Sequence, residues 1–188
     1  MSVRKDQIRI QAQTLFRERG YVATSMRDIA ESLGIEAASL YNHIHSKEQI
    51  LQEICFRMAE HFFAAIEPIV KSTVVPVEKL RLAIEAHLAV IAAHNDASAV
   101  FLHEWRHLGE PYLSDFKLMR NRYEKIFRTL IEDGIKSGDF RDMNIALTAR
   151  TMLSAMNWTY ESYNSKRKID PAETASHIGT MMLKGILK

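Results

Sequence analysis

Apolar residues recur along this chain every three or four positions, the spacing that places side chains on one face of an α-helix. The first such segment carries Ile8, Ala12, Leu15 and Phe16. No segment shows the sustained alternation of β-branched and polar residues that indicates a half-buried strand. The pattern therefore predicts an all-α protein.

Glycine and proline residues separate the periodic segments and set their expected ends. These separating residues are Gly20, Gly34, Pro68, Pro76, Gly109, Pro111, Gly138 and Pro171. About nine helices are expected, of which the last six cover about residues 47–66, 77–94, 97–108, 111–136, 144–163 and 171 onward. Ser46 and Asp170 are expected to cap the fourth and ninth helices, because serine and aspartate are favoured N-cap residues.

Residues 24–47 have the pattern of two short helices joined by a tight turn. Thr24 or Ser25 can cap the first of them, with Asp28 in the first turn, where the helix dipole favours an acidic group. Gly34 then suits the left-handed backbone of a tight turn. The segment is therefore expected to form a helix-turn-helix.

The apolar residues of this segment are placed to hold the two helices together. Ile29 and Leu33 lie one turn apart, and Ala30 between them is small enough for a close approach of the second helix. Ile35 and Leu40 can then pack back against them. Two helices held in this way are typical of a DNA-reading unit, so we expect gene control and not catalysis.

The outward side chains of the second helix suit the major groove. Alanine can contact a thymine methyl, serine suits several base edges, and asparagine can bind adenine through two hydrogen bonds. Ala37, Ser39 and Asn42 are therefore expected to face bases, while Tyr41, His43 and Lys47 suit phosphates. The expected DNA-binding residues are Thr24, Ser25, Arg27, Glu36, Ala37, Ser39, Tyr41, Asn42, His43 and Lys47.

With these residues the chain resembles the TetR family of bacterial transcription regulators. The resemblance rests on Ala12, Leu15, Phe16, Gly20, Tyr21, Thr24, Ile29, Ala30, Leu33, Gly34, Ile35, Leu40, Tyr41, His43 and Lys47. Three positions depart from the family pattern: Glu36 replaces a capping serine or threonine, Ala38 replaces a frequent glycine, and Ile44 replaces phenylalanine. The resemblance covers roughly the first quarter of the chain.

The family resemblance implies an organisation and a function for the whole chain. Residues 1–46 would form the DNA-binding domain, and residues 47–188 an effector-binding and dimerisation domain. The protein would be a repressor that a small-molecule effector releases from its operator. No enzymatic activity and no cofactor are expected.

Composition and charge agree with a globular regulator without pointing to DNA. The chain has 188 residues, 47% hydrophobic and 26% charged, which is typical of a soluble domain. Its net charge of +2 at pH 7 would not by itself indicate a nucleic-acid partner. The lone Cys55 cannot form an intramolecular disulfide, and no apolar run has the length of a membrane span or of a signal peptide core. A cytoplasmic protein is expected.

The last two expected helices carry apolar side chains on more than one face. These residues are Leu147, Leu153, Trp158, Ile178, Met181, Met182, Leu183, Ile186 and Leu187. They suit a homodimer in which two copies form a four-helix bundle about a twofold axis, although a monomer core rich in methionine and leucine would show the same pattern. Such a dimer would present its two readers roughly 34–36 Å apart, so the operator should be nearly palindromic.

Helices five to eight combine apolar residues with polar ones that a buried effector pocket could use. The expected effector-binding residues are His87, Phe101, His103, Arg106, Arg120, Tyr123, Phe127, Met156, Asn157 and Tyr160. The runs at residues 103–108 and 120–123 look like those of fatty-acid-responsive and acyl-CoA-responsive relatives, which would place Arg106 and Arg120 on phosphate or carboxylate groups. The alternative effector is a cationic or aromatic drug, with Glu104 as its counter-ion.

A zinc site is the remaining alternative. His103, Glu104 and His107 match the H-E-x-x-H pattern of zinc hydrolases, and His87 could add a ligand. The pattern is short, and no nucleophile or phosphate loop accompanies it. We therefore expect no metal at this position and keep the hydrolase only as the less favoured alternative.

Overall fold

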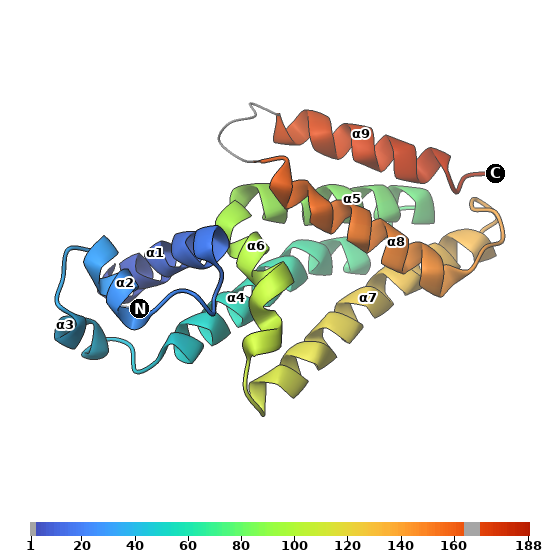
Figure 1. Ribbon diagram of the computed structural model, residues 1–188. Coiled ribbons are helices and arrows are strands. Elements are labelled where there is room, and N and C mark those ends of the chain that lie inside the picture. Colours follow the sequence, from blue (N-terminus) through green and yellow to red (C-terminus); the bar gives the residue numbers. More distant parts are fainter. Residues whose placement is uncertain (1–2, 164–169) are drawn as a thin grey trace. The chain divides into compact units, whose positions relative to one another are not determined.

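The computed structural model describes residues 3–163 and 170–188, and this part of the chain is all-helical (Figure 1). An isolated bridge between Phe140 and Leu187 is the one pairing of strand type in the described ranges. The α-helices are α1 (Val3–Arg19), α2 (Met26–Ser32), α3 (Ala37–Tyr41), α4 (Lys47–Lys71), α5 (Pro76–Ala93), α6 (Asn95–His103), α7 (Tyr112–Lys136), α8 (Ile145–Trp158) and α9 (Pro171–Lys184). Two 3₁₀ turns follow α6 and α8, η1 (Glu104–His107) and η2 (Thr159–Glu161). The all-α prediction and the expected helix number are confirmed for the described residues.

The chain divides into two compact units. Unit 1 comprises Met1–Ala59 and Asp96–Lys117, and unit 2 comprises Glu60–Asn95 and Leu118–Lys188. Helices α4 and α7 each contribute residues to both units. These units are defined by compactness. The boundary expected at residue 46 is a functional one, between a DNA-binding domain and an effector-binding and dimerisation domain, and it stays a prediction.

Unit 1 contains the helix-turn-helix. In α1 the predicted apolar face is buried, since Ile8, Ala12, Leu15 and Phe16 are each at most 5% exposed. Helix α1 packs on α2, and α2 packs on α3. The side chain of Asp96 accepts hydrogen bonds from Thr14, over 3.1 Å, and from Arg17, so the start of α6 is tied to α1.

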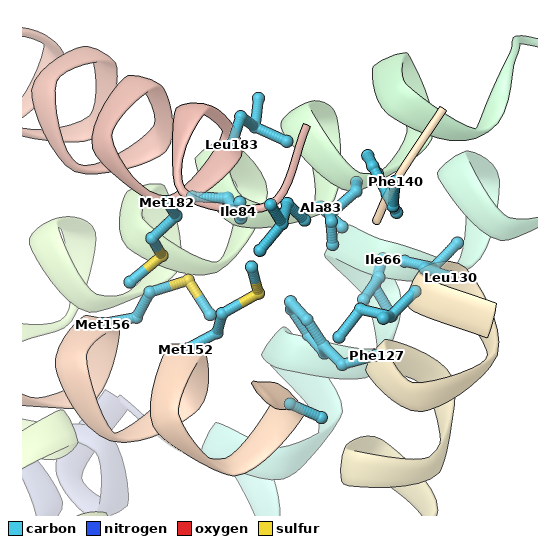
Figure 2. Close-up of a cluster of buried hydrophobic side chains, with 14 of the residues drawn as sticks. Ile66, Ala83, Ile84, Phe127, Leu130, Phe140, Met152, Met156, Met182 and Leu183 are labelled. Atoms are coloured by element: carbon cyan, nitrogen blue, oxygen red, sulfur yellow. The ribbon is translucent and has the colours of Figure 1, made fainter. Parts of the chain in front are cut away.

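Unit 2 has its own hydrophobic core, built from α4, α5, α7, α8 and α9 (Figure 2). Phe127 and Leu130 of α7 meet Ile66 of α4, and Met152 and Met156 of α8 lie near Met182 of α9. Helix α9 packs along α5, where Gly179 faces Ile84. The α9 cap is as predicted, because the Asp170 side chain accepts a hydrogen bond from the Ala172 amide over 2.9 Å.

Three helix ends differ from the sequence prediction. Helix α4 continues through Pro68 to Lys71, because proline removes one backbone donor without preventing the next residues from bonding. Helix α6 ends at His103 and the chain tightens into η1, so the helix expected at residues 97–108 is shorter. Helix α8 likewise ends at Trp158 and continues as η2, short of residue 163.

Within residues 3–163 and 170–188, no helix combines the length and the hydropathy that crossing a lipid bilayer requires.

Candidate functional site

Residues 24–47, which contain α2 and α3, are called the reader below. Its first helix, α2, begins at a complete capping box. The Ser25 hydroxyl accepts a hydrogen bond from the Asp28 amide over 3.2 Å, and the Ser25 amide donates to the Asp28 carboxylate over 2.6 Å. Hydrogen bonds from the Ser25 hydroxyl and amide hold the pKa of Asp28 below its usual range. Of the two caps considered from the sequence, Ser25 is therefore the one that caps α2.

The turn between α2 and α3 has the geometry that the glycine predicted. Gly34 has φ +64°, the left-handed conformation that a side chain disfavours. The Ile35 amide donates to the Ala30 carbonyl over 3.0 Å, which closes the end of α2. Ile29, Ala30 and Leu40 are buried, so the apolar residues join α2 to α3 as expected.

Helix α3 presents a short polar face. The predicted DNA contacts Arg27, Glu36, Ser39, Tyr41 and Asn42 are exposed, with Tyr41 49% exposed, and Ala37 and His43 are half-buried. Glu36 occupies the N-cap position but makes no capping hydrogen bond with its side chain. This agrees with the departure from the family pattern at that position, because a glutamate is too long to act as a serine-type cap.

Two predicted DNA contacts have structural roles in unit 1. Thr24 is only 1% exposed and donates its hydroxyl to the Gly20 carbonyl over 2.9 Å, so a direct contact of its side chain with DNA is not supported. Lys47 donates to the carbonyl oxygens of Tyr21 and Thr24 over 2.7 Å each, and of Val22 over 3.4 Å. The Lys47 ammonium therefore holds the loop before α2, and a phosphate contact would compete with these bonds.

Tyr21 lies at the centre of this arrangement. The Lys47 ammonium is 4.3 Å from the centre of its ring, and the His107 ring stacks on it at 5.3 Å between centroids. Beside it, the Gly109 amide donates to the Glu48 carboxylate over 2.9 Å. The segment after α6 is thus bonded to the start of α4 and to the reader loop, all within unit 1. The sequence predicted neither contact, because both join residues far apart in the chain.

The predicted effector residues of unit 2 include one buried polar cluster. His87 on α5 is 3% exposed, and its ring nitrogens lie 3.1 Å from the Tyr123 hydroxyl of α7 and 3.1 Å from the Asn157 amide oxygen of α8. Since the amide oxygen can only accept, Nε2 of His87 donates to it, and the Tyr123 hydroxyl donates to Nδ1. We call these three residues, the buried His87 and the half-buried Tyr123 and Asn157, the buried polar cluster.

Burial keeps this cluster neutral. It lowers the pKa of His87 to about 4, against a weaker opposing effect of the hydrogen bond to Asn157. Burial also raises the pKa of the Tyr123 hydroxyl above its usual value. The cluster is therefore uncharged near pH 7 and suits a neutral polar group, such as a carbonyl or hydroxyl, better than an ion.

Aromatic rings of α4 and α7 surround the cluster. Phe62 stacks on His87 with 4.7 Å between ring centroids, and Phe63 meets Tyr123 edge-on at 5.5 Å. Phe127, which the sequence did predict, lies 5.6 Å from Tyr123. Phe62 and Phe63 were missed, although two consecutive phenylalanines in the middle of an amphipathic helix were the available signal.

The other predicted effector residues are distributed over both units. Met156 is buried in the core of unit 2, Tyr160 donates to Glu161 over 2.9 Å, and Arg120 is half-buried on α7. Phe101, His103 and Arg106 belong to unit 1, where Arg106 is exposed and lies 4.7 Å from the Trp105 ring. Their joint use with the buried polar cluster stays a prediction.

The H-E-x-x-H run does not have the geometry of a zinc helix. His103 is the last residue of α6, whereas Glu104 and His107 belong to η1, so the two histidines do not share one α-helical face. The Glu104 carboxylate lies 3.5 Å from Nε2 of His107. Among the residues that the structure describes, no group of three His, Cys, Asp or Glu residues could hold a metal ion.

Helices α8 and α9 carry an exposed apolar face in addition to their buried one. Leu147, Trp158 and Met181 are between 58% and 63% exposed, whereas Met182, Leu183 and Ile186 are buried in the core. The apolar residues of the last two helices are therefore of two kinds, some buried in the core and others exposed. Large side chains left in water suggest a surface that another molecule covers.

Known proteins match both parts of the chain. Residues 10–54 match the family described as bacterial regulatory proteins, tetR family, and residues 73–186 match the tetracyclin repressor-like C-terminal domain. The HTH-type transcriptional repressor KstR2 of Mycobacterium tuberculosis is 31% identical over 178 residues, 94% of this chain and 87% of that protein. The fatty acid metabolism regulator protein of Bacillus subtilis is 21% identical over 177 residues, 93% of this chain and 91% of that protein.

A solved structure extends the similarity to the whole fold. The ketosteroid transcriptional regulator KstR2 of Mycobacterium tuberculosis superposes with a TM-score of 0.94 and 27% identity, covering 100% of this chain and 97% of that one. Relatives of this kind are regulators and not enzymes, so the zinc hydrolase is not favoured. The chain belongs to the TetR family of transcription regulators, which bind DNA operators and respond to small-molecule effectors.

Proposed function

We propose that this protein is a homodimeric repressor that binds a near-palindromic operator and leaves it when an acyl-CoA binds. The observation that carries the proposal is the role of α4. Its residue Lys47 holds the reader loop, and its residue Phe62 stacks on the buried polar cluster. A single helix thus contacts both the DNA-reading part and the expected effector site.

The exposed side chains of the reader support two kinds of DNA contact, to bases and to phosphates. Ser39 and Asn42 are exposed on or next to α3 and would read base edges, while Tyr41, Arg27 and the half-buried His43 would contact phosphates. Thr24 and Lys47 would act indirectly, by fixing the loop that positions α2. A DNA-binding regulator of this family would act in the cytoplasm.

The exposed apolar face supports the homodimer. Leu147 and Trp158 of α8 and Met181 of α9 would be covered by the same residues of a second copy, which is how a twofold interface closes. Two readers fixed by one twofold axis read the same sequence in opposite directions. This is the physical reason for a near-palindromic operator.

The buried polar cluster supports an apolar effector with a neutral polar group. A thioester carbonyl fits this chemistry, because the Asn157 side-chain NH2 group can donate to it, and because the cluster is uncharged and lies among Phe62, Phe63 and Phe127. A cationic drug fits less well, since the cluster contains no carboxylate and Glu104, its proposed counter-ion, belongs to unit 1. The names of the relatives, a fatty acid regulator and a ketosteroid regulator, also concern lipid-like molecules.

Release would follow from a shift between two conformations. An effector that binds one conformation more tightly than the one selected by DNA lowers the DNA-bound population. An effector that separates Phe62 from His87 would displace α4. The first residue of this helix, Lys47, holds the loop before α2, so the displacement would change the position of that loop. Helix α4 has no glycine, and its only proline, Pro68, lies in its last turns, so little within it can absorb such a change.

The test measures operator binding and release on the same material. Fluorescence anisotropy of the full chain with DNA flanking its own gene should show tight binding, weakened by acyl-CoAs of a preferred chain length. Tyr123→Phe should keep operator affinity and blunt the release, because it removes one hydroxyl from the cluster. Arg106→Ala tests the predicted headgroup contact in the same way.

Two results would overturn the proposal. If no acyl-CoA released the DNA while another ligand class did, the effector assignment would be wrong. If Tyr123→Phe and Asn157→Leu responded to the effector as the unaltered protein does, the buried polar cluster would not be its binding site.

A further inference from the structure

Glu36 is an exposed carboxylate of the reader to which the proposed function assigns no contact. It occupies the N-cap position of α3, and its side chain makes no capping hydrogen bond. Within residues 3–163 and 170–188, no lysine, arginine or histidine lies at salt-bridge distance from it. The fold therefore leaves this carboxylate available to another molecule.

The position of Glu36 relates it to the two residues that are expected to read bases. The Ser39 amide donates to the Glu36 carbonyl over 3.0 Å, so the two residues lie one helical turn apart. Asn42 follows Ser39 by the same spacing, and all three side chains are exposed. When Ser39 and Asn42 contact base edges, Glu36 is brought to the same groove.

The chemistry of a carboxylate limits what Glu36 can contact there. An ionised carboxylate only accepts hydrogen bonds. In the major groove guanine presents two acceptors, thymine presents an acceptor and a methyl group, and adenine presents an acceptor beside its amino group. Cytosine presents its N4 amino donor and no acceptor. It is therefore the base whose edge attracts a carboxylate without also repelling it.

We propose that Glu36 is a specificity-determining residue that selects a cytosine in each half-site of the operator. Its carboxylate accepts a hydrogen bond from the N4 amino group, while the nearby phosphates repel it. Glu36 thus weakens binding to DNA in general and recovers this loss at cytosine. The inference rests on the proposed function, since it needs α3 in the groove.

The family pattern does not supply this role. A serine or threonine at the position is uncharged and short enough to cap the helix. Glu36 makes no such capping bond, and it brings a negative charge to a surface that otherwise has to meet a polyanion. The preference for cytosine is therefore a property of this chain's own residue.

The test is selection of binding sites from a random DNA library by the full chain without effector. Cytosine should be enriched at one position of each half-site. Fluorescence anisotropy with the selected site then measures the effect of single-base changes. Replacement of this cytosine by another base, in both half-sites, should raise Kd about tenfold, as expected for the loss of a specific base contact.

Glu36→Gln is the informative variant, because it keeps the length of the side chain, removes the charge and adds a donor. Glutamine can bind adenine through two hydrogen bonds, so the preferred base should change from cytosine to adenine at the same position. Kd for random DNA should fall about threefold, since a charge that repels phosphates is removed. Glu36→Ala should show no preference at this position.

Matched variants separate base reading from general charge. Glu31→Gln removes an exposed carboxylate from α2 and should leave cytosine preferred. Asn42→Ala should alter a different position, because six residues of helix span about 9 Å, or about three base-pair steps. Thermal unfolding followed by circular dichroism should be unchanged in Glu36→Gln, since the side chain makes no bond in the folded protein.

Two outcomes would overturn the inference. If Glu36→Gln kept the base preferences of the unaltered protein, Glu36 would be a solvated surface carboxylate. If Glu31→Gln produced the same change of preference, general charge and not base reading would be responsible. Failure of the proposed function looks different: a protein that selects a site with cytosine but keeps it in the presence of every acyl-CoA contradicts the effector alone.

Discussion

The Lys47 ammonium lies 4.3 Å from the centre of the Tyr21 ring while it donates hydrogen bonds to the carbonyls of Tyr21 and Thr24. The first residue of α4 is thus attached to the loop that precedes α2. The Lys47 ammonium has a structural role here, because its hydrogen bonds and its contact with the Tyr21 ring stabilise this loop. Partial burial lowers its pKa, in keeping with that position.

Lys47→Ala is therefore expected to weaken binding to every DNA sequence by a similar factor. The loss of hydrogen bonds from a charged donor should also lower the free energy of unfolding by about 2 kcal/mol. Anisotropy titrations with operator and random DNA, together with urea unfolding, measure the two effects. Lys71→Ala, at the exposed far end of the same helix, is the control. A selective loss of operator binding with unchanged stability would contradict this role.

Asn42→Ala should change which sequences are bound more than how tightly DNA is bound in general. Asn42 is exposed at the C-cap of α3, and one bidentate contact to adenine contributes about 1–3 kcal/mol of discrimination. Selection of binding sites from a random library should show relaxed preference at one position of each half-site. An equal fall in affinity for operator and random DNA would mean that Asn42 does not read a base.

Trp158→Glu should convert the dimer into monomers. The indole is 59% exposed on α8, and an aromatic residue at the centre of an interface commonly contributes about 2 kcal/mol or more to binding. Analytical ultracentrifugation gives the dissociation constant. Leu118→Glu places the same charge at a 61% exposed apolar position on α7 and should leave the dimer intact. If both variants stayed dimeric, the interface would lie elsewhere.

The stability of the protein should fall between pH 7 and pH 5 because of His87. The folded state holds its pKa at about 4, while in the unfolded chain it is near 6.5, so only the unfolded state gains a proton in this range. The contribution is complete above pH 6.5 and decreases as the pH falls towards 4. Linkage gives a loss of about 2 kcal/mol by pH 5.

Urea unfolding at several pH values measures this dependence. His87→Gln should be less stable at pH 7 but should show a shallower fall towards pH 5. His177→Gln, which removes an exposed histidine of α9, should keep the slope of the unaltered protein. An identical slope in His87→Gln would show that His87 is not the group responsible.

Local features of the fold could be predicted from the sequence because each depends on neighbouring residues. The cap at Ser25, the left-handed Gly34, the uncapped start of α3 at Glu36 and the Asp170 cap of α9 are of this kind. Helix ends were less predictable. Pro68 lies inside α4, since a proline removes only one hydrogen bond of a long helix whose packing supports it.

The candidate sites were predictable as residue types but not as partners. His87, Tyr123 and Asn157 were all expected to contact an effector, yet nothing in their spacing showed that they bond to one another. The bonds of Lys47 to a loop more than twenty residues earlier were missed for the same reason. Convergence of residues from separate helices depends on tertiary packing, which periodicity does not encode.

Gly109 is a position where the chain has no room for a side chain unless Glu48 moves. A methyl group at this position would fall 2.5 Å from the Glu48 carboxylate oxygen, the same oxygen that its amide bonds. Any larger residue would therefore displace that carboxylate and disturb the bond between the start of α4 and the segment after η1. One small, uncharged replacement at this position would therefore alter how the start of α4 is attached, with every predicted ligand-facing and DNA-facing side chain left as it is.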